Sequence, residues 1–423
     1  MNHFELRGGE LWCEDTPLAR IAEAVGTPAY VYSTATLERH YLVFRDALRA
    51  HPQIGEPLVA YAVKALSNVS VLATLARLGA GADTVSEGEM RRALAAGVPP
   101  ERIIFSGVGK TAAELAFALE TGVAEINVES APELALLSRI AGEKGVRPAI
   151  AIRVNPDVGA GGHAKISTGR SENKFGVSLE EAERLYAAAA ADPHLRPVGV
   201  ACHIGSQIIE LGPLEAAFCK MRGLVEALRA SGHAVERLDL GGGLGVPYFH
   251  QPDPPSPADF AAMAARTVGG LGLQIAVEPG RVIAANAGVL LSRVIHIHAR
   301  PDGRRFLVLD AAMNDLIRPA MYEAYHDIRP VKPVAGEAGA YDVVGPVCET
   351  GDTFSRDRPL PPLASGDLVA FMTAGAYGAV MASEYNTRPL APEVLVRGAE
   401  FAVVRPRPTY DEMLAREPKA PWL

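Results

Sequence analysis

A single lysine at the end of an apolar run is the first residue in this chain that could carry out covalent chemistry. Lys64 follows the run 58–63, which is bounded by Pro57 and Ser67 and is typical of a buried strand. A buried ammonium group is costly, so it is either paired with a carboxylate or used as an amine. For a lysine alone the paired state is the commoner outcome. Residues further along the chain favour the interpretation of Lys64 as a reactive amine.

A second group of residues could bind an anion. Gly241, Gly242 and Gly243 follow a strand-like run, and without Cβ atoms their backbone amides can approach a phosphate closely. A tight turn without a ligand explains the glycines alone equally well. The pattern is not Gly-x-Gly-x-x-Gly, so a dinucleotide is disfavoured. The motif Glu-Pro-Gly-Arg at 278–281 adds a carboxylate on a rigid turn and a guanidinium group suited to phosphate or carboxylate.

A planar ring completes the set. His203 begins the run His-Ile-Gly-Ser-Gln at 203–207, and on its own it could be an ordinary core imidazole. A lysine amine, a phosphate-binding turn, a planar ring and a buried carboxylate are together the parts of a pyridoxal-phosphate site, in which the lysine binds the cofactor as a Schiff base.

These residues need elements that bring them to one place. Eight strand-like runs alternate with helical stretches, at 58–62, 81–84, 102–105, 125–128, 149–154, 197–203, 237–240 and 273–278. Strands that alternate with helices pair in parallel, and eight such units close into a (β/α)8 TIM-type barrel. An open doubly wound sheet is the alternative.

Active sites of such barrels lie at the carboxyl ends of the strands, and all eight runs end in polar residues or glycine. These are Lys64, Asp83, Ser106, Asn127 with Glu129, Asn155, His203, Gly241 to Gly243, and Glu278.

The sequence pattern changes after residue 281. Short β-branched runs at 289–298, 305–309, 341–347 and 367–372 are separated by turns and predict a C-terminal antiparallel β-sandwich or β-barrel domain. The N-terminal segment has similar spacing, and we expect it to join this domain. The predicted domains are therefore a barrel over 27–282 and a β domain made of 1–26 and 283–423.

Composition narrows the class of protein. The chain has 423 residues, a formal charge of −8 and 48% apolar residues. A net acidic protein of this kind is not expected to bind nucleic acid. No apolar run approaches the roughly 20 residues of a membrane span, and the first residues do not resemble a signal peptide. The four cysteines form no Cys-x-x-Cys pair, so we expect no metal site, no disulfide framework and a cytoplasmic location.

Several motifs resemble one known family. Tyr-Ala-Val-Lys-Ala at 61–65, the runs at 203–207 and 241–245, and Glu-Pro-Gly-Arg at 278–281 are similar to the barrel-type pyridoxal-phosphate decarboxylases of basic amino acids, which have an alanine-racemase-like fold. Met-Asn-Asp-Leu-Ile-Arg-Pro-Ala-Met-Tyr at 313–322 and Val-Gly-Pro-Val-Cys-Glu-Thr-Gly-Asp at 344–352 resemble the diaminopimelate decarboxylases specifically. The resemblance covers about 27–388. It implies decarboxylation of meso-2,6-diaminopimelate to L-lysine and CO2, the final step of lysine biosynthesis, with pyridoxal 5'-phosphate as cofactor.

The resemblance also implies roles in cofactor binding. Lys64 would hold the cofactor, His203 would stack on its ring, and Glu278 would face the ring nitrogen and keep it protonated. Racemases of the same barrel are understood to place an arginine there, so Glu278 favours decarboxylation. The other implied cofactor contacts are Asp83, Ser206, Gly241, Gly242, Gly243, Gly280, Arg281 and Tyr377.

For the substrate, the resemblance implies a pocket for the second amino-acid head of diaminopimelate. Arg318 would bind its carboxylate and Glu349 its ammonium group, whereas a lysine or ornithine decarboxylase needs only the acid. Tyr322, Arg281 and Tyr377 would complete these contacts. Cys348 would return a proton to the α-carbon. Because Cys348 and Glu349 reach the neighbouring subunit in this family, the resemblance implies a homodimer with shared active sites.

Three alternatives remain open. One is a related decarboxylase of another basic or carrier-bound amino acid, and a second is a non-catalytic protein that binds pyridoxal phosphate. The third is an unrelated barrel enzyme that uses no cofactor. The segment 159–174 is similar to the family's active-site loop, but none of its residues is given a role.

Overall fold

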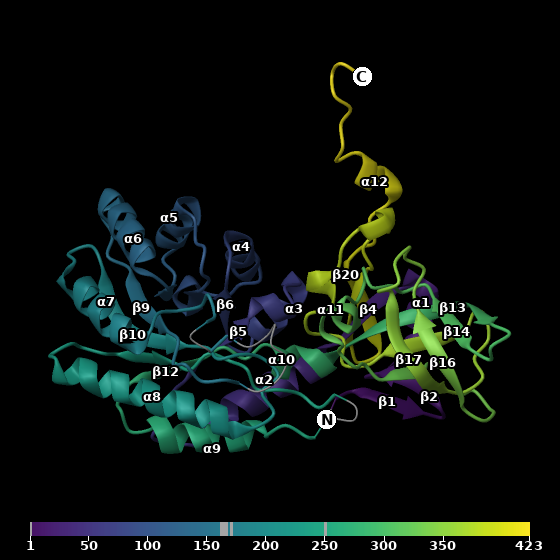
Figure 1. Cartoon of the computed structure of the whole chain (residues 1–423), viewed down its shortest axis with the longest axis horizontal. Helices are drawn as coiled ribbons and strands as arrows, with labels where there is room; N and C mark the ends of the chain where they lie inside the picture. The colour runs from purple at the N-terminus through teal and green to yellow at the C-terminus, as the bar shows by residue number, and fades with distance from the viewer. Residues whose placement is uncertain (1, 161–167, 170–171, 249–251) are drawn as a thin grey trace. The chain divides into compact units, whose positions relative to one another are not determined.

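The computed structural model describes residues 2–160, 168–169, 172–248 and 252–423, which form two compact units (Figure 1). The barrel unit contains the described residues of Glu38–Pro247 and Pro252–Ile283. The β unit contains the described residues up to Leu37, Tyr248 and Ala284–Leu423. His163 and Lys165 of the segment 159–174 lie outside the described residues.

The barrel unit is a closed ring of eight parallel strands, as predicted. They are β5 (Leu58–Ala62), β6 (Gly81–Thr84), β7 (Ile103–Phe105), β8 (Glu125–Val128), β9 (Ala149–Val154), β10 (Arg196–Cys202), β11 (Arg237–Asp239) and β12 (Gln274–Val277). Pairing of β12 with β5 closes the ring, which rules out the open sheet. Every residue of β5 is buried, as expected for a parallel strand that is covered on both faces.

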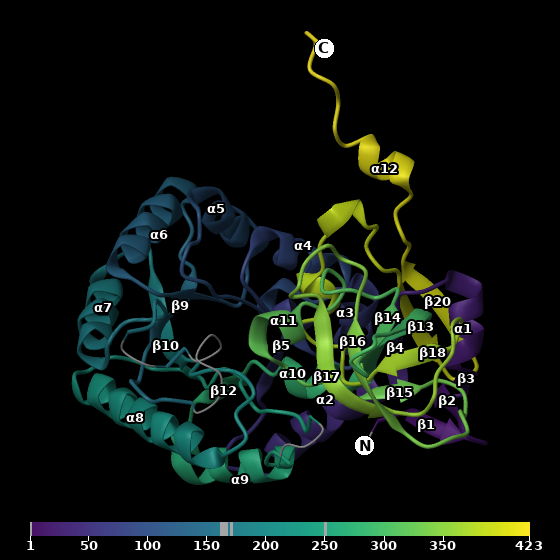
Figure 2. The same ribbon diagram turned by 45° about the vertical axis from the view of Figure 1, so that its right-hand side comes forward.

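Helices surround these strands (Figure 2). They are α2 (Thr34–Arg49), α3 (Val69–Ala76), α4 (Glu87–Ala95), α5 (Ala112–Thr121), α6 (Ala131–Lys144), α7 (Leu179–Ala191), α8 (Leu211–Ala230) and α9 (Pro257–Val268). Short polar side chains explain where several begin: Thr111 and Glu114 form a capping box on α5, and the Ser130 hydroxyl accepts a hydrogen bond at the start of α6.

The β unit is built around the long strand β13 (Gly288–Ala299). Its main sheet has the order β17-β16-β14-β13-β4-β19-β20, and β18 (Leu368–Phe371) also pairs with β13 and with β15 (Ile328–Pro330). The other strands are β4 (Ala29–Ser33), β14 (Arg305–Leu309), β16 (Gly339–Val344), β17 (Thr353–Leu360), β19 (Glu393–Arg397) and β20 (Glu400–Arg405). Most pairs are antiparallel, as predicted, and β14 with β16 and β4 with β19 are parallel.

The N-terminal segment belongs to this unit. A small sheet of β1 (Phe4–Arg7), β2 (Glu10–Cys13) and β3 (Thr16–Pro17) leads into α1 (Leu18–Val25). Leu11, Leu18 and Ile21 share one apolar core with Val31 of β4 and Val289 of β13. Three short helices complete the chain: α10 (Arg281–Ala284), α11 (Arg318–Tyr322) and α12 (Tyr410–Leu414).

The limits of the two units differ from the predicted domain limits. The prediction began the barrel at residue 27, whereas β4 pairs with β13 and β19 in the β unit, and the barrel unit begins at Glu38. In the sequence, β4 followed by α2 has the strand-then-helix pattern of a barrel repeat. Within the described part of the chain, no helix has the length and apolar character to cross a membrane.

Candidate active site

The amine of Lys64 lies at the end of a barrel strand and is paired with a carboxylate. Strand β5 ends at Ala62, and Lys64 follows in a single 3-10 turn, Val63–Ala65. Its Nζ is 2.6 Å from Oδ2 of Asp83, which lies on β6 and is fully buried, while the Lys64 side chain is 32% exposed. The structure therefore combines both interpretations of this lysine: it is ion-paired and accessible. Asp83 can hold the amine in place without burying it.

Glu278 follows β12 and is buried beside two other acids. Burial, then the charges of Asp239 and Asp83, raise the pKa of Glu278, while the Lys64 ammonium lowers it. Asp239 is the last residue of β11, and its side chain is hydrogen-bonded to that of Glu278. Asp239 had no predicted role. An acid at the end of a predicted strand, two residues before three glycines, was the signal for it.

The glycine turn after β11 contacts the neighbouring strand ends. Gly241 and Gly243 have φ values of 64° and 117°, which favour glycine. The Gly242 N–H donates a hydrogen bond to Nδ1 of His203 over 3.1 Å. Burial lowers the pKa of His203 well below its usual value, and the charges of Lys64 and Arg153 act in the same direction. The imidazole is therefore a neutral ring fixed to the glycine turn.

Arg281 and Ser206 lie together beside this turn. The Arg281 guanidinium is buried, and its Nε and Nη2 donate to Oγ of Ser206 over 3.2 and 3.1 Å. Gly280 directly precedes Arg281, and a Cβ there would lie 3.0 Å from the Cβ atoms of Ala62 and Ala65. Glycine thus lets this turn lie against the chain segment that carries the lysine.

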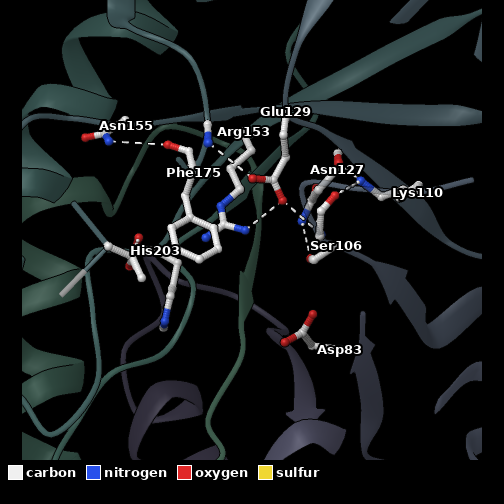
Figure 3. Close-up of polar contacts among 12 residues, drawn as sticks. Asp83, Ser106, Lys110, Asn127, Glu129, Arg153, Asn155, Phe175 and His203 are labelled. Atoms are coloured by element: carbon white, nitrogen blue, oxygen red, sulfur yellow. Dashed lines mark hydrogen bonds and ion pairs between the residues drawn. The ribbon is translucent and has the colours of Figure 1, made fainter. Parts of the chain in front are cut away.

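The ends of β7, β8 and β9 are linked by a buried polar network (Figure 3). Glu129 accepts hydrogen bonds from Arg153 Nη1 over 2.8 Å and from the Gly176 N–H over 3.1 Å. Asn127 donates to Ser106 Oγ over 3.1 Å. These strand-end residues had no predicted role. Their bonds hold the ends of β7, β8 and β9 in place, and a rigid rim positions a site more precisely than free loops do.

In the β unit, Arg318 lies in an aromatic and polar environment. It begins α11, is 6% exposed, and donates from Nε to Nε2 of His326 over 3.3 Å. Its guanidinium carbon is 5.4 Å from the ring centre of Tyr248 and 5.9 Å from that of Tyr322. Arg318 and Tyr322, both predicted to bind substrate, thus lie together. Tyr377, by contrast, belongs to a separate turn and has a φ of 56°, an uncommon value for a residue other than glycine.

Cys348 and Glu349 lie on an exposed loop between β16 and β17. The Cys348 N–H donates to Oδ1 of Asn386 over 3.0 Å, and the Tyr385 hydroxyl is hydrogen-bonded to the Glu349 carboxylate. Buried Asp352 closes the loop by accepting the backbone N–H groups of Met313 and Val347, each over 2.7 Å. Tyr385, Asn386 and Asp352 had no predicted role.

The barrel rim fits pyridoxal phosphate. An accessible amine can hold an aldehyde, the glycine turn with Arg281 and Ser206 offers donors to a phosphate, and a neutral ring lies beside them. Among the described residues, no hydrogen-bond donor reaches Oε1 of Glu278, so this buried acid has capacity for a further partner.

Comparison with known proteins gives the class first. The family model described as "Pyridoxal-dependent decarboxylase, pyridoxal binding domain" matches residues 35–285, which span the barrel strands and the rim. The cofactor is accordingly pyridoxal 5'-phosphate, in a barrel-type decarboxylase.

Relatives over the full length are more specific. The diaminopimelate decarboxylases of Zymomonas mobilis and Pseudomonas aeruginosa are 49% and 50% identical, each over 421 residues, covering 99% and 100% of both chains. The crystal structure of diaminopimelate decarboxylase from Helicobacter pylori with L-lysine is 40% identical, with a TM-score of 0.90, and covers 95% of this chain and 99% of its own. The corresponding M. jannaschii structure with L-lysine is 36% identical, with a TM-score of 0.95 and complete coverage of both chains. This chain belongs to the diaminopimelate decarboxylase family of pyridoxal-phosphate-dependent carboxy-lyases.

Proposed function

We propose that the enzyme decarboxylates meso-2,6-diaminopimelate to L-lysine and CO2, the final step of lysine biosynthesis. The observation that carries this proposal is one barrel rim that combines the Lys64 amine, the glycine turn bonded to His203, the Arg281–Ser206 pair and buried Glu278. Relatives that match the whole chain are named diaminopimelate decarboxylase, and two of the similar structures are complexes with L-lysine.

Bound pyridoxal phosphate supplies the electron sink for the bond that releases CO2. In our assignment Lys64 holds the cofactor through its amine, with Asp83 as its ionic partner. The neutral His203 ring would stack on the cofactor, and Glu278 would keep the ring nitrogen protonated. Ser206, Arg281 and the amides of Gly241, Gly242, Gly243 and Gly280 would donate hydrogen bonds to the phosphate, with Tyr377 as a further contact. Donors fixed in advance cost no reorganisation when charge develops.

The β unit carries substrate specificity in this proposal. Arg318, with Tyr322 beside it, binds the distal carboxylate of diaminopimelate together with Arg281, and Glu349 binds the distal ammonium group. A substrate without the distal carboxylate does not make the charged contact with the buried Arg318 guanidinium and loses the binding energy of that contact. Lysine and ornithine are therefore disfavoured as substrates.

We further propose a homodimer in which Cys348 and Glu349 serve the active site of the partner copy. Both residues are exposed in the single chain, although their loop is held by Asp352 and Asn386. An ordered loop that presents a thiol and a carboxylate to the outside is suited to an interface. There the Cys348 thiol returns a proton to the α-carbon. We place the enzyme in the cytoplasm, where the exposed thiols of Cys219 and Cys348 would stay reduced.

The substrate panel tests the reaction. The protein loaded with pyridoxal phosphate is given meso-diaminopimelate, lysine, ornithine and arginine separately, and CO2 is measured. We expect release from diaminopimelate at least about 100-fold above the others, since each loses the charged contact with Arg318. Equal release from lysine would favour a related decarboxylase, and absence of release from any substrate with cofactor bound would favour a non-catalytic protein.

Mixing two inactive variants tests the shared site. Lys64→Ala and Cys348→Ala are each expected to have little activity alone. After subunit exchange, heterodimers contain one site with both native residues, so activity is expected to reach about one quarter of that of the wild type by random pairing. No recovery, in heterodimers isolated through a different affinity tag on each variant, would place both residues in the same subunit's site.

A further inference from the structure

Asp239 is a buried acid that the proposed mechanism does not use. It ends β11 and is 1% exposed. Side chains two residues apart on a strand point to the same face, and Arg237, two residues earlier, pairs with Glu125 of β8 over 3.1 Å. Arg237 therefore already has an acidic partner, and Asp239 is free to serve another group nearer the carboxyl ends of the strands.

Asp239 touches both the glycine turn and the acid proposed to face the ring nitrogen. Its Oδ1 accepts the Gly241 N–H over 2.8 Å. Its side chain is hydrogen-bonded to that of Glu278, and the Glu278 N–H in turn donates to the Gly241 carbonyl over 2.8 Å. Asp239, Gly241 and Glu278 thus form a closed set of contacts that joins the phosphate end of the site to the ring-nitrogen end.

Two ionised carboxylates cannot hydrogen-bond to each other, because both are acceptors. Among the described residues, no donor reaches Oδ2 of Asp239 or Oε1 of Glu278. The charged groups that act on this pair are Asp83, Lys64 and Arg237. Burial raises the pKa of both acids, and the charge of Asp239 raises that of Glu278 further, whereas hydrogen bonds from Glu278 and the Gly241 amide oppose the rise at Asp239. The directions of these pKa shifts favour Glu278 as the residue that carries the shared proton.

We propose that Asp239 is a positioning residue that accepts a hydrogen bond from protonated Glu278 and ties this side chain to the glycine turn. One proton is thereby held between Glu278 and Asp239, which leaves the other carboxyl oxygen of Glu278 to accept a hydrogen bond from the protonated ring nitrogen of the cofactor. The inference rests on the proposed role of Glu278 and adds to it a second acid, which fixes both the direction and the protonation of the first.

Two substitutions separate these effects. Asp239→Ala removes the acceptor for both Glu278 and the Gly241 N–H. Asp239→Asn keeps both contacts, because the amide oxygen accepts from Gly241 and the amide nitrogen donates to an ionised Glu278, but it cannot share the proton. Glu125→Gln is the matched control, since it neutralises another buried barrel acid that does not touch Glu278.

The measurements are the dissociation constant of pyridoxal phosphate from the apoprotein and the pH titration of the visible absorbance band of the loaded protein. We expect Asp239→Ala to weaken cofactor binding about 10-fold or more, and Asp239→Asn and Glu125→Gln to stay within about 3-fold of the wild type. In Asp239→Asn the absorbance transition moves to lower pH, because Glu278 loses the neighbouring negative charge. Glu125→Gln leaves the transition in place.

The inference is overturned if folded Asp239→Ala binds the cofactor as tightly as the wild type, or if Asp239→Asn titrates as the wild type does. Should Asp239→Ala not fold, the titration of Asp239→Asn still decides the matter. Failure of the wild type to bind pyridoxal phosphate would instead remove the proposed function, and this inference with it. The two failures are therefore distinguishable.

Discussion

Asp352 offers the sharpest test of how the loop with Cys348 and Glu349 is held. Its carboxyl group is buried and accepts two backbone N–H groups over 2.7 Å each, from Met313 and Val347. Burial raises its pKa and these two bonds oppose the rise. Asp352→Ala leaves both donors without an acceptor in the protein.

The size of the effect follows from those two bonds. A buried donor left without its partner costs about 1 to 3 kcal/mol, so the pair corresponds to about 2 to 6 kcal/mol. With an unfolding entropy of about 2 cal/mol/K per residue, that loss lowers the melting temperature of a 423-residue protein by about 2 to 7 °C. The loop also loses its fixed position, and displacement of a reacting group by about 1 Å can cost about 100-fold in turnover. We expect kcat to fall about 10- to 100-fold.

The assay compares three variants by thermal melting and by steady-state CO2 release. Asp352→Asn keeps one acceptor oxygen and is expected to fall between Asp352→Ala and the wild type. Asp342→Ala is the control, because Asp342 of β16 accepts a single backbone N–H, from Asp357 over 3.0 Å. If Asp352→Ala matches Asp342→Ala in both melting temperature and kcat, Asp352 does not hold the catalytic loop.

Three further predictions concern the substrate, the proton donor and pH. Arg318→Ala is expected to raise the KM for diaminopimelate about 100-fold, from loss of a charged hydrogen bond, while the dissociation constant of the cofactor changes less than about 2-fold; equal loss of cofactor would contradict this role. Cys348→Ala should lower kcat more than it changes KM, and an unchanged kcat would remove the thiol from the mechanism. Burial raises the pKa of Glu125 to about 7, and Arg237 opposes the rise. Its protonated form is thus favoured by folding, and the stability it contributes is lost as pH rises from about 4.5 through 7, by about 3 kcal/mol. Glu125→Gln should therefore gain in unfolding free energy relative to the wild type over this pH range, and parallel stability curves would refute that assignment.

The barrel could be predicted from the sequence because its signals are local. Each parallel strand is a short apolar run that is buried on both faces, and each helix has an Ala-, Leu- and Glu-rich pattern, so the alternation is visible without knowing any pairing. The β unit was harder. Strand β17, with the sequence Thr-Phe-Ser-Arg-Asp-Arg-Pro-Leu, carries three charges and was missed, and β4 has the pattern of a barrel strand until its pairing with β13 is known.

The site residues likewise fall into those that the sequence reveals and those that only the fold reveals. Lys64, Glu278 and the glycine turn are recognisable because each is an unusual residue directly after an apolar run. Asp239 was not predicted because its role depends on Glu278, which follows the next strand. Only the fold brings the two side chains together. Asp352 was part of a recognised motif, but its two backbone donors come from separate segments of the chain. Contacts between distant segments are what the sequence alone does not contain.

The most direct measurement is the position of the cofactor on the chain. The loaded protein is reduced with borohydride, digested, and the peptide that carries the pyridoxyl group is identified by mass spectrometry. The account predicts the label on Lys64, together with loss of the visible absorbance band in Lys64→Ala. Label on another lysine, such as the buried Lys110 that pairs with Glu133 over 2.7 Å, would contradict it.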